Sequence, residues 1–248
     1  MPRRSDPALG VAIVLALALV GCSKAKTETA VVGHHAVQFV LPKGWEHLDH
    51  GRQQLFRFEE SQISMVDLGP ATREAMVAEL RGADSLWRAG RRQDMFQRIR
   101  ELKSPMLRYA SHEQRAAFWK PWTDVTYIPN LADSIAIGGA LQALIEGVGA
   151  FEEATPERMQ EYVLFMITGT KRREVGHQDK RTIHGADWTD VHLWDPVSHM
   201  NRSRVAFVAN HGYLLVLETD HGLYETSEPA FEALLTSLEV TVGPPGAR

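Results

Sequence analysis

Two polar side chains in the last third of the chain have the types and the spacing of an acid–base pair. Asp190 and His192 are separated by one residue. On a β-strand, such residues point to the same face and lie roughly 6.6 Å apart along the chain, so that Asp190 could orient His192 for proton transfer. Trp188 and Trp194 would share that face, which is equally typical of a partly covered polar sheet surface. We favour that second interpretation and assign no catalytic residue, because the sequence indicates no nucleophile.

A second group of side chains has the chemistry of metal ligands. His47 and His50 are separated by two residues, one of which is Asp49, and the pair His34-His35 precedes them. Several imidazoles in a mobile loop could bind zinc or copper weakly. A polar tether and loop is the simpler interpretation, so we assign no metal ligand and expect no cofactor; His47 and His50 remain weak candidates.

The chain holds one cysteine, and its position is informative. Arg3 and Arg4 place positive charge at the amino terminus. The segment Ala8–Val20 is almost wholly apolar, and Gly21 and Cys22 follow it. This length suits the apolar region of a secretory signal and is short for a membrane-spanning helix of about 20 residues. A single cysteine cannot form an internal disulfide or a cysteine-based zinc site.

The segment Leu19-Val20-Gly21-Cys22 resembles the lipobox of bacterial lipoproteins. The resemblance implies that residues 1–21 are a signal peptide, that the chain is cleaved before Cys22, and that Cys22 carries acyl chains such as palmitate. Several acyl chains anchor a protein stably to a membrane. Ser23 rather than Asp follows Cys22, which in a Gram-negative cell implies the periplasmic face of the outer membrane. An ordinary signal peptide with a buried free cysteine is the alternative.

Composition bounds the class of protein. The chain has 248 residues, with 27 Lys+Arg against 31 Asp+Glu and a formal net charge of -4. There is no basic excess with which to displace counterions from phosphate, so we expect no nucleic-acid partner. Hydrophobic residues at 44% and charged residues at 23% are ordinary globular values, which excludes collagen and long disorder.

The order of the patterns predicts one domain with an addition. Residues 22–34 are small and polar and read as a lipidated tether. A single domain is expected over 35–242, interrupted by a helical insertion at about 70–150, and 243–248 form a tail. The expected fold class is α+β, with a mainly antiparallel sheet covered by helices.

Alternating apolar residues predict strands, and apolar residues at helical spacing predict helices. His184-Gly185 and His211-Gly212 are predicted to be turns between strands. Thr155 before Pro156 is a helix start, and Pro121 is expected to end a helix. The predicted strands are 37–41, 54–59, 62–68, 173–183, 188–194, 204–209, 213–218 and 239–242, and the predicted helical segments are 71–102, 111–119, 134–151, 155–168 and 227–238.

Two stretches of the chain are similar to PsbP-like domains, the superfamily that includes photosystem PsbP proteins, Mog-type Ran-binding proteins and DcrB-type bacterial lipoproteins. The first is Phe39-Val40-Leu41-Pro42-Lys43-Gly44-Trp45 with the hairpin after it. The second joins Ile183–Trp188, the turn Asn210–Tyr213 and the helix Phe231–Leu238. The resemblance implies an antiparallel sheet covered by helices, and an accessory or binding role rather than catalysis.

These observations favour a lipid-anchored accessory or binding protein of the cell envelope. The membrane would be reached through Cys22, and a protein partner through the helical insertion. One alternative is an envelope hydrolase or metal-dependent enzyme with its site near Asp190 and His192. Another is a structural envelope protein that assembles through the apolar segment Ser134–Phe151, which we expect to be buried or partner-facing rather than inserted in a membrane.

Overall fold

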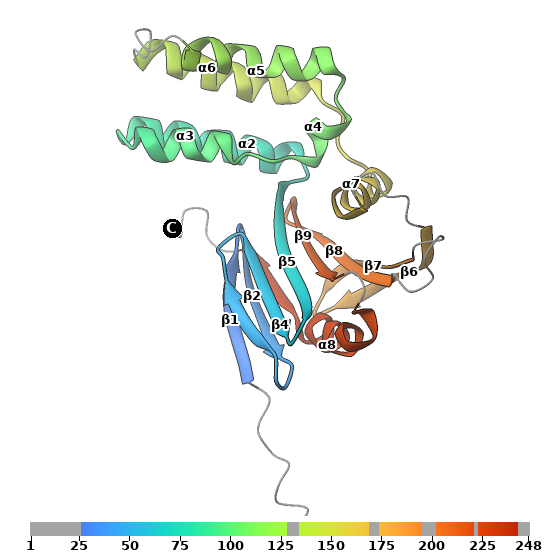
Figure 1. Ribbon diagram of the computed structural model, residues 1–248. Helices are drawn as coiled ribbons and strands as arrows, with labels where there is room; N and C mark the ends of the chain where they lie inside the picture. Colours follow the sequence, from blue (N-terminus) through green and yellow to red (C-terminus); the bar gives the residue numbers. More distant parts are fainter. Residues whose placement is uncertain (1–25, 128–133, 169–173, 195–201, 221–222, 243–248) are drawn as a thin grey trace, which may run out of the picture.

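Two antiparallel sheets and a separate group of helices make up the part of the chain that can be described. The computed structural model describes residues 26–127, 134–168, 174–194, 202–220 and 223–242 (Figure 1). Within these ranges the sheets have seven and three strands, and neighbouring strands pair antiparallel. The predicted α+β class with a mainly antiparallel sheet is therefore confirmed.

The larger sheet has the strand order β3-β4-β5-β9-β8-β7-β6. Its two turns predicted from His-Gly pairs are confirmed. His184 and Gly185 have φ of 47° and 80°, and His211 and Gly212 have φ of 47° and 82°. Positive φ at both central residues gives the tight turn whose twist suits a two-residue hairpin. The strands are β3 (Glu46–Asp49), β4 (Gln53–Phe58), β5 (Ser61–Pro70), β6 (Glu174–Ile183), β7 (Ala186–Trp194), β8 (Arg202–Asn210) and β9 (Tyr213–Thr219).

The smaller sheet corrects the predicted tether. Residues Lys26–Val32 form strand β1, which pairs along its whole length with β2 (His35–Leu41); β10 (Glu239–Val242) pairs with the other side of β2. Ala30 and Val32 of β1 lie with the buried residues of β2 in the core, which is the physical reason that this polar-looking segment folds. Of the predicted tether, residues 22–25 lie outside the described residues.

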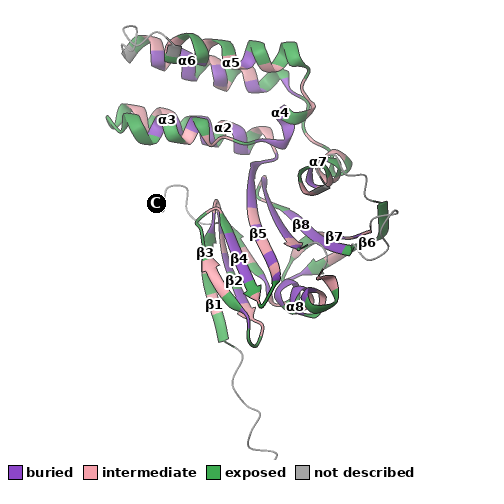
Figure 2. Cartoon of the chain, in the orientation of Figure 1, coloured by how far each residue is buried: buried purple, intermediate pink, exposed green. Residues whose placement is uncertain are grey.

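Each face of the larger sheet is covered by a different helix because side chains alternate along the strands. Trp188, Ala206 and Leu215 pack with α8 (Tyr224–Ser237) and the smaller sheet. Residues at the alternate positions of β7, β8 and β9 point the other way and pack against α7 (Pro156–Thr168). The central strands are accordingly buried on both faces (Figure 2).

The helices between β5 and α7 have a core of their own, and we call them the helical arm. They lie within the predicted insertion at about 70–150, and Figure 1 shows them beyond one end of the sheets as two layers, α2–α3 and α5–α6. Their buried side chains, among them Met76, Leu80, Phe118 and Leu141, form one cluster. The arm comprises α2 (Arg73–Arg88), α3 (Arg92–Arg100), α4 (Pro105–Tyr109), α5 (His112–Tyr127), α6 (Ser134–Gly147) and the short 3-10 helix η2 (Val148–Ala150).

Pro121 does not end its helix, so that prediction is wrong. Helix α5 begins with a capping box, in which Ser111 Oγ accepts from the Gln114 amide at 3.1 Å, and it continues through Pro121 to Tyr127. Proline removes one backbone hydrogen bond from a helix. Phe118 and Trp122, on either side of Pro121, are both buried in the core of the arm, and this packing offsets the loss.

Candidate functional site

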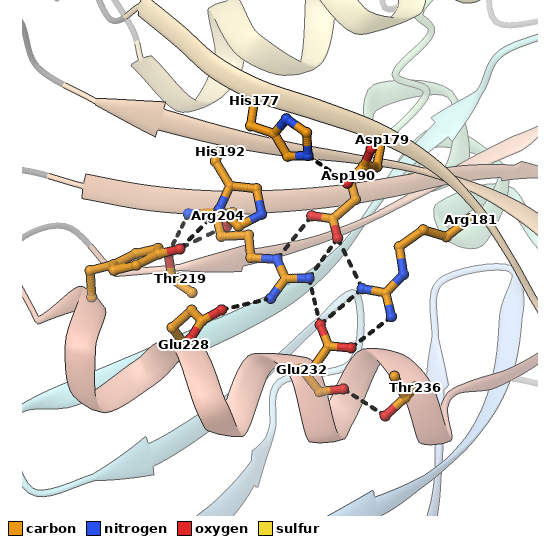
Figure 3. Close-up of polar contacts among 11 residues, drawn as sticks. His177, Asp179, Arg181, Asp190, His192, Arg204, Thr219, Glu228, Glu232 and Thr236 are labelled. Carbon is orange, nitrogen blue, oxygen red and sulfur yellow. Dashed lines mark hydrogen bonds and ion pairs between the residues drawn. The ribbon is translucent and has the colours of Figure 1, made fainter.

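Asp190, predicted from sequence as part of a polar site, lies beneath helix α8 in an ionic network (Figure 3). Its carboxylate is held by Arg204 on the neighbouring strand β8. Arg204 Nε donates to Asp190 Oδ1 at 2.9 Å, and Nη2 donates to Oδ2 at 2.6 Å. The two side chains are only 3% and 4% exposed. A bidentate arginine–carboxylate pair of this kind is among the strong hydrogen-bonded pairs in proteins.

Helix α8 supplies two further carboxylates and β6 a second arginine. Glu232 accepts from Arg204 Nη2 at 2.5 Å and from Arg181 Nη2 at 2.6 Å. Arg181 Nη1 also lies 3.1 Å from Asp190 Oδ2, and Arg204 Nη1 lies 3.2 Å from Glu228 Oε1. The network thus joins three adjacent strands to one helix, because residues 181, 190 and 204 occupy the sheet face that α8 covers.

The network keeps Asp190 and Glu232 ionised. Burial would raise the pKa of Asp190, but the hydrogen bonds and charge of Arg204 outweigh burial and lower it. The hydrogen bond from Arg181 is the largest cause that lowers the pKa of Glu232 to about 2, with Arg204 adding to it. Permanently ionised carboxylates with paired oxygens are poor general acids or bases near pH 7. The arrangement holds α8 on the sheet.

His192 shares the face of Asp190, as the strand pattern predicted, but the two side chains have different partners. His192 Nδ1 lies 2.9 Å from the hydroxyl oxygen of Tyr224, the first residue of α8. Burial and the nearby charge of Arg204 lower the pKa of His192, so the ring is neutral at pH 7. The hydrogen bonds of Asp190 go to arginines instead. Asp190 therefore does not orient His192 as it would in a catalytic pair.

The weak metal candidates His47 and His50 are not brought together as ligands. His47 lies on β3, with Nδ1 at 2.8 Å from Glu28 Oε2 and Nε2 at 2.7 Å from Gln54 Oε1. The centroid of its ring lies 5.2 Å from the ring centroids of Phe39 and Phe56, so the imidazole packs against the core of the sheets. His50 is exposed in the turn that follows. Among the described residues, no three His, Cys, Asp or Glu side chains form a group that could hold a metal ion.

A second ionic cluster, centred on His34, was not predicted from the sequence. His34 sits in the turn between β1 and β2, with Nδ1 at 2.7 Å from Asp67 Oδ2 and Nε2 at 2.7 Å from Glu79 Oε1. Glu79 of α2 also accepts from Arg98 Nε at 3.0 Å. The ring of His34 stacks on Tyr213 with the centroids 4.1 Å apart. The cluster connects the first hairpin, the larger sheet and the helical arm.

The charges of this cluster stabilise one another. Burial alone would lower the pKa of His34, but hydrogen bonds to Asp67 and Glu79 raise it to about 9. Burial would raise the pKa of Glu79, but His34 and Arg98 lower it to about 2. Burial and the neighbouring Glu79 raise the pKa of Tyr213. At pH 7, His34 is therefore an imidazolium held between two carboxylates.

The sequence did carry a signal for this cluster. Asp67 stands between the apolar residues Val66 and Leu68 in the buried end of β5, and Glu79 falls on the buried stripe of α2 beside Met76 and Leu80. A carboxylate at a buried position needs a partner. The pattern alone could not identify His34, because it lies 33 residues from Asp67 along the chain.

The segment that carries the proposed anchor, with Cys22 and the signal peptide 1–21, lies outside the described residues, as does the tail 243–248. Helix α6, which makes up most of the segment Ser134–Phe151, buries Ile137, Leu141 and Leu144 inside the arm. Within the described ranges, none of the helices combines the length and the apolar character that crossing a bilayer requires.

Comparisons with known proteins give a distant likeness. No family model matches the sequence, and no curated protein matches it. Among solved structures, the chain is similar to cyanobacterial PsbP (CyanoP) from Synechocystis sp. PCC 6803, solved in solution. The match has 12% sequence identity and a TM-score of 0.39, and it covers 90% of this chain and 99% of that chain. A likeness of this degree concerns the fold alone and assigns no function.

Proposed function

We propose that this protein is a lipid-anchored accessory or binding protein of the cell envelope, attached to the membrane through Cys22. The observation that carries the proposal is the position of the chain's single cysteine, which ends an apolar run in Leu19-Val20-Gly21-Cys22 behind two arginines. In a Gram-negative cell, Ser23 after the cysteine favours the periplasmic face of the outer membrane.

The place where the fold begins supports an orientation. Strand β1 starts at Lys26, four residues after Cys22. Four residues span about 14 Å at most, so the anchor would hold the start of β1 close to the lipid surface. The far end of β1 leads into the His34 turn, which contacts Glu79 of the helical arm. The arm would therefore point away from the membrane (Figure 1).

The helical arm is the surface that we assign to a protein partner. It has its own core and reaches beyond the sheets, so it presents a large surface at the end remote from the anchor. Ile135 at the start of α6 is 84% exposed, the highest value among the exposed large apolar side chains of the described residues.

The anchor is tested by Cys22→Ser. The parent chain should fractionate with membranes, incorporate labelled palmitate and lose its first 21 residues. The Cys22→Ser chain should lose the label and leave the membrane fraction. Ser23→Ala serves as the matched control, because it changes the neighbouring residue and keeps the thiol. A Cys22→Ser chain that stays in the membrane with unchanged mass would overturn the proposal.

The partner surface is tested in intact cells with a photo-crosslinking residue. Placed at Ile135 on the arm, it should give a discrete adduct with an envelope protein. Placed at Gln38, which is exposed on the outer face of the smaller sheet, it should give none. Equal adducts at both positions, or an adduct at Gln38 alone, would argue against the arm as the binding surface.

A further inference from the structure

A cavity of about 770 Å³ runs along the outward face of helix α2 in the helical arm, and we call it the α2 cavity. Its floor contains the apolar side chains of Val77, Ala78 and Leu86, which point away from the buried Met76 and Leu80 of the same helix. Ligand sites in proteins have volumes of about 300 to 1,000 Å³. Ala78 is exposed, so the cavity is an open groove along a helix face.

Arginines dominate the charged lining of the α2 cavity. The charged residues that line it are Arg73, Glu74, Arg81 and Arg98. Arg98 is already paired with the buried Glu79 at 3.0 Å. The side chain of Arg73, in contrast, donates through Nε to the backbone carbonyl of Phe151 at 2.6 Å, which carries no formal charge. Arg81 is exposed and has no ion-pair partner among the described residues. The guanidinium groups of Arg73 and Arg81 can therefore accept a carboxylate from outside.

The helices around the cavity hold more arginines than carboxylates, although the whole chain has a formal net charge of -4. The carboxylates of α2 and α3 are Glu74, Glu79, Asp84 and Asp94, and the arginines are Arg73, Arg81, Arg88, Arg92, Arg98 and Arg100. Asp84 and Asp94 are engaged by Arg88 and Arg91. Glu153, which accepts from the Arg73 backbone amide at 3.2 Å, offsets part of the remaining charge. A local excess of arginine in an acidic chain suits an acidic partner.

We propose that the α2 cavity binds an amphipathic helix of a partner protein, with carboxylates on Arg73 and Arg81 and apolar side chains on Val77 and Ala78. The planar fork of a guanidinium group holds a carboxylate through two parallel hydrogen bonds. The proposal rests on the proposed function, in which the helical arm meets a protein partner. It adds the place of contact on the arm and the chemistry of the segment that binds there.

The backbone around the cavity favours a helix over an extended segment. An extended peptide needs the free backbone groups of a sheet edge, whereas a helix satisfies its own. The floor of the α2 cavity is itself a helix, whose central N–H and C=O groups are bonded to one another. Arg73 and Arg81 stand eight residues apart, which is about 12 Å along the helix axis. Carboxylates about two turns apart on a partner helix have the same spacing.

An anionic membrane surface would also attract arginines, but the proposed orientation argues against it. Strand β1 begins at Lys26, close to the anchor at Cys22. The arm lies beyond the opposite end of the sheets (Figure 1). The α2 cavity is therefore remote from the lipid to which the chain is attached, and an envelope protein is the occupant that the orientation favours.

The test places a photo-crosslinking residue at Ala78 of the full chain in intact cells and maps the crosslinked peptide by mass spectrometry. The mapped segment should be helical, with two carboxylates about two turns apart. Arg81→Glu should lower the adduct yield about fivefold or more, because it sets like charges against one another. Arg88→Glu is the matched control, since Arg88 is an exposed arginine of α2 outside the cavity lining, and its yield should match the parent's.

A charge exchange makes the test specific. Replacing the mapped carboxylate of the partner by Lys should restore the adduct of the Arg81→Glu chain. Because Arg81 is exposed, Arg81→Glu should unfold like the parent, which excludes misfolding as the cause of a lost adduct. A mapped segment without carboxylates, a yield unchanged in Arg81→Glu, failure of the exchange, or an adduct with lipid would overturn the proposal. An adduct at Ile135 with none at Ala78 would overturn it and leave the proposed function standing, whereas no adduct at either position would overturn both.

Discussion

His34 Nε2 lies 2.7 Å from Glu79 Oε1, and this contact joins the first hairpin of the chain to the first helix of the arm. The same imidazole reaches Asp67 on the central strand β5 with its other nitrogen. Asp67 and Glu79 are almost fully buried, so each needs a positively charged partner. The hairpin, the larger sheet and the arm thus depend on one side chain for part of their relative placement.

Replacing His34 by Ala should destabilise the fold by about 3 kcal/mol, because it leaves buried carboxylates without their shared cation. Urea unfolding at pH 6, followed by circular dichroism, measures the change. His50→Ala is the control, since exposed substitutions usually change stability by less than about 0.5 kcal/mol. A His34→Ala chain as stable as His50→Ala would show that the cluster contributes nothing.

The same cluster gives stability a dependence on pH. The pKa of His34 is about 9 in the fold, above its ordinary 6.5. Its contribution is therefore complete below pH 6.5 and is lost as the pH rises through 9. The pKa of Glu79 is about 2, below its ordinary 4.5, so its contribution is complete above pH 4.5 and is lost as the pH falls through 2.

Unfolding free energy should accordingly be highest between pH 4.5 and 6.5 as far as these two groups are concerned. His34→Gln removes the titrating imidazole. The difference in stability between the parent and His34→Gln should therefore shrink as the pH rises from 6.5 to 9. A difference that stays constant over this interval would mean that His34 is not charged in the folded chain.

The strand and helix patterns were predictable where one local rule dominates. The two His-Gly turns and the helix that starts after Thr155 follow from local conformational preferences, and the structure has both. The strand β1 was read as a tether because its polar residues hide the inward alternation of Ala30 and Val32. Its pairing with β2 is a contact that only the folded hairpin reveals.

The sites were less predictable, since they depend on distant partners. Asp190 and His192 were correctly placed on one face of a strand. Their partners come from β8 and α8, however. Arg204 donates hydrogen bonds to the Asp190 carboxylate, which the sequence pattern had placed next to His192. Periodicity shows which face a residue occupies and does not show which residues of other elements it meets.

Removing Arg204 should be among the more damaging changes in the larger sheet. Arg204→Met keeps the length of the side chain. It leaves Asp190 and Glu232 with Arg181 alone, and it removes the arginine that pairs with Glu228. The loss of one partner from a buried pair costs about 3 to 5 kcal/mol. The double variant Arg204→Met with Asp190→Asn should lose less than the sum of the single changes, because the two residues are in contact.

Arg88→Met provides the matched control for that prediction. Arg88 pairs with Asp84 one turn away on α2, but its side chain is exposed, and exposed pairs contribute little. Thermal or urea unfolding of the four variants separates the two kinds of pair. Arg204→Met unfolding at the same denaturant concentration as Arg88→Met would mean that the network does not hold α8 on the sheet.

Replacing glycine by alanine should have opposite effects on stability at two positions. Gly33 has a φ of +60°, and a Cβ there would overlap the carboxylate of Asp67. Gly33→Ala should therefore destabilise the fold by more than about 2 kcal/mol, since it adds strain at a left-handed position and displaces Asp67 from His34. Gly139 lies in helix α6 with open space around the position of a Cβ. Gly139→Ala should stabilise the fold by about 0.5 to 1 kcal/mol through helix propensity.

The two variants are compared by urea unfolding at pH 6, where the His34 cluster is fully charged. Gly33→Ala should also weaken the pH dependence that the parent shows between 6.5 and 9, because a displaced Asp67 no longer raises the pKa of His34 and only Glu79 does. Gly139→Ala should keep that dependence while its whole curve shifts upward. If Gly33→Ala is destabilised but retains the parent's pH profile, the cost arises from backbone strain alone, and the turn does not position His34 against Asp67.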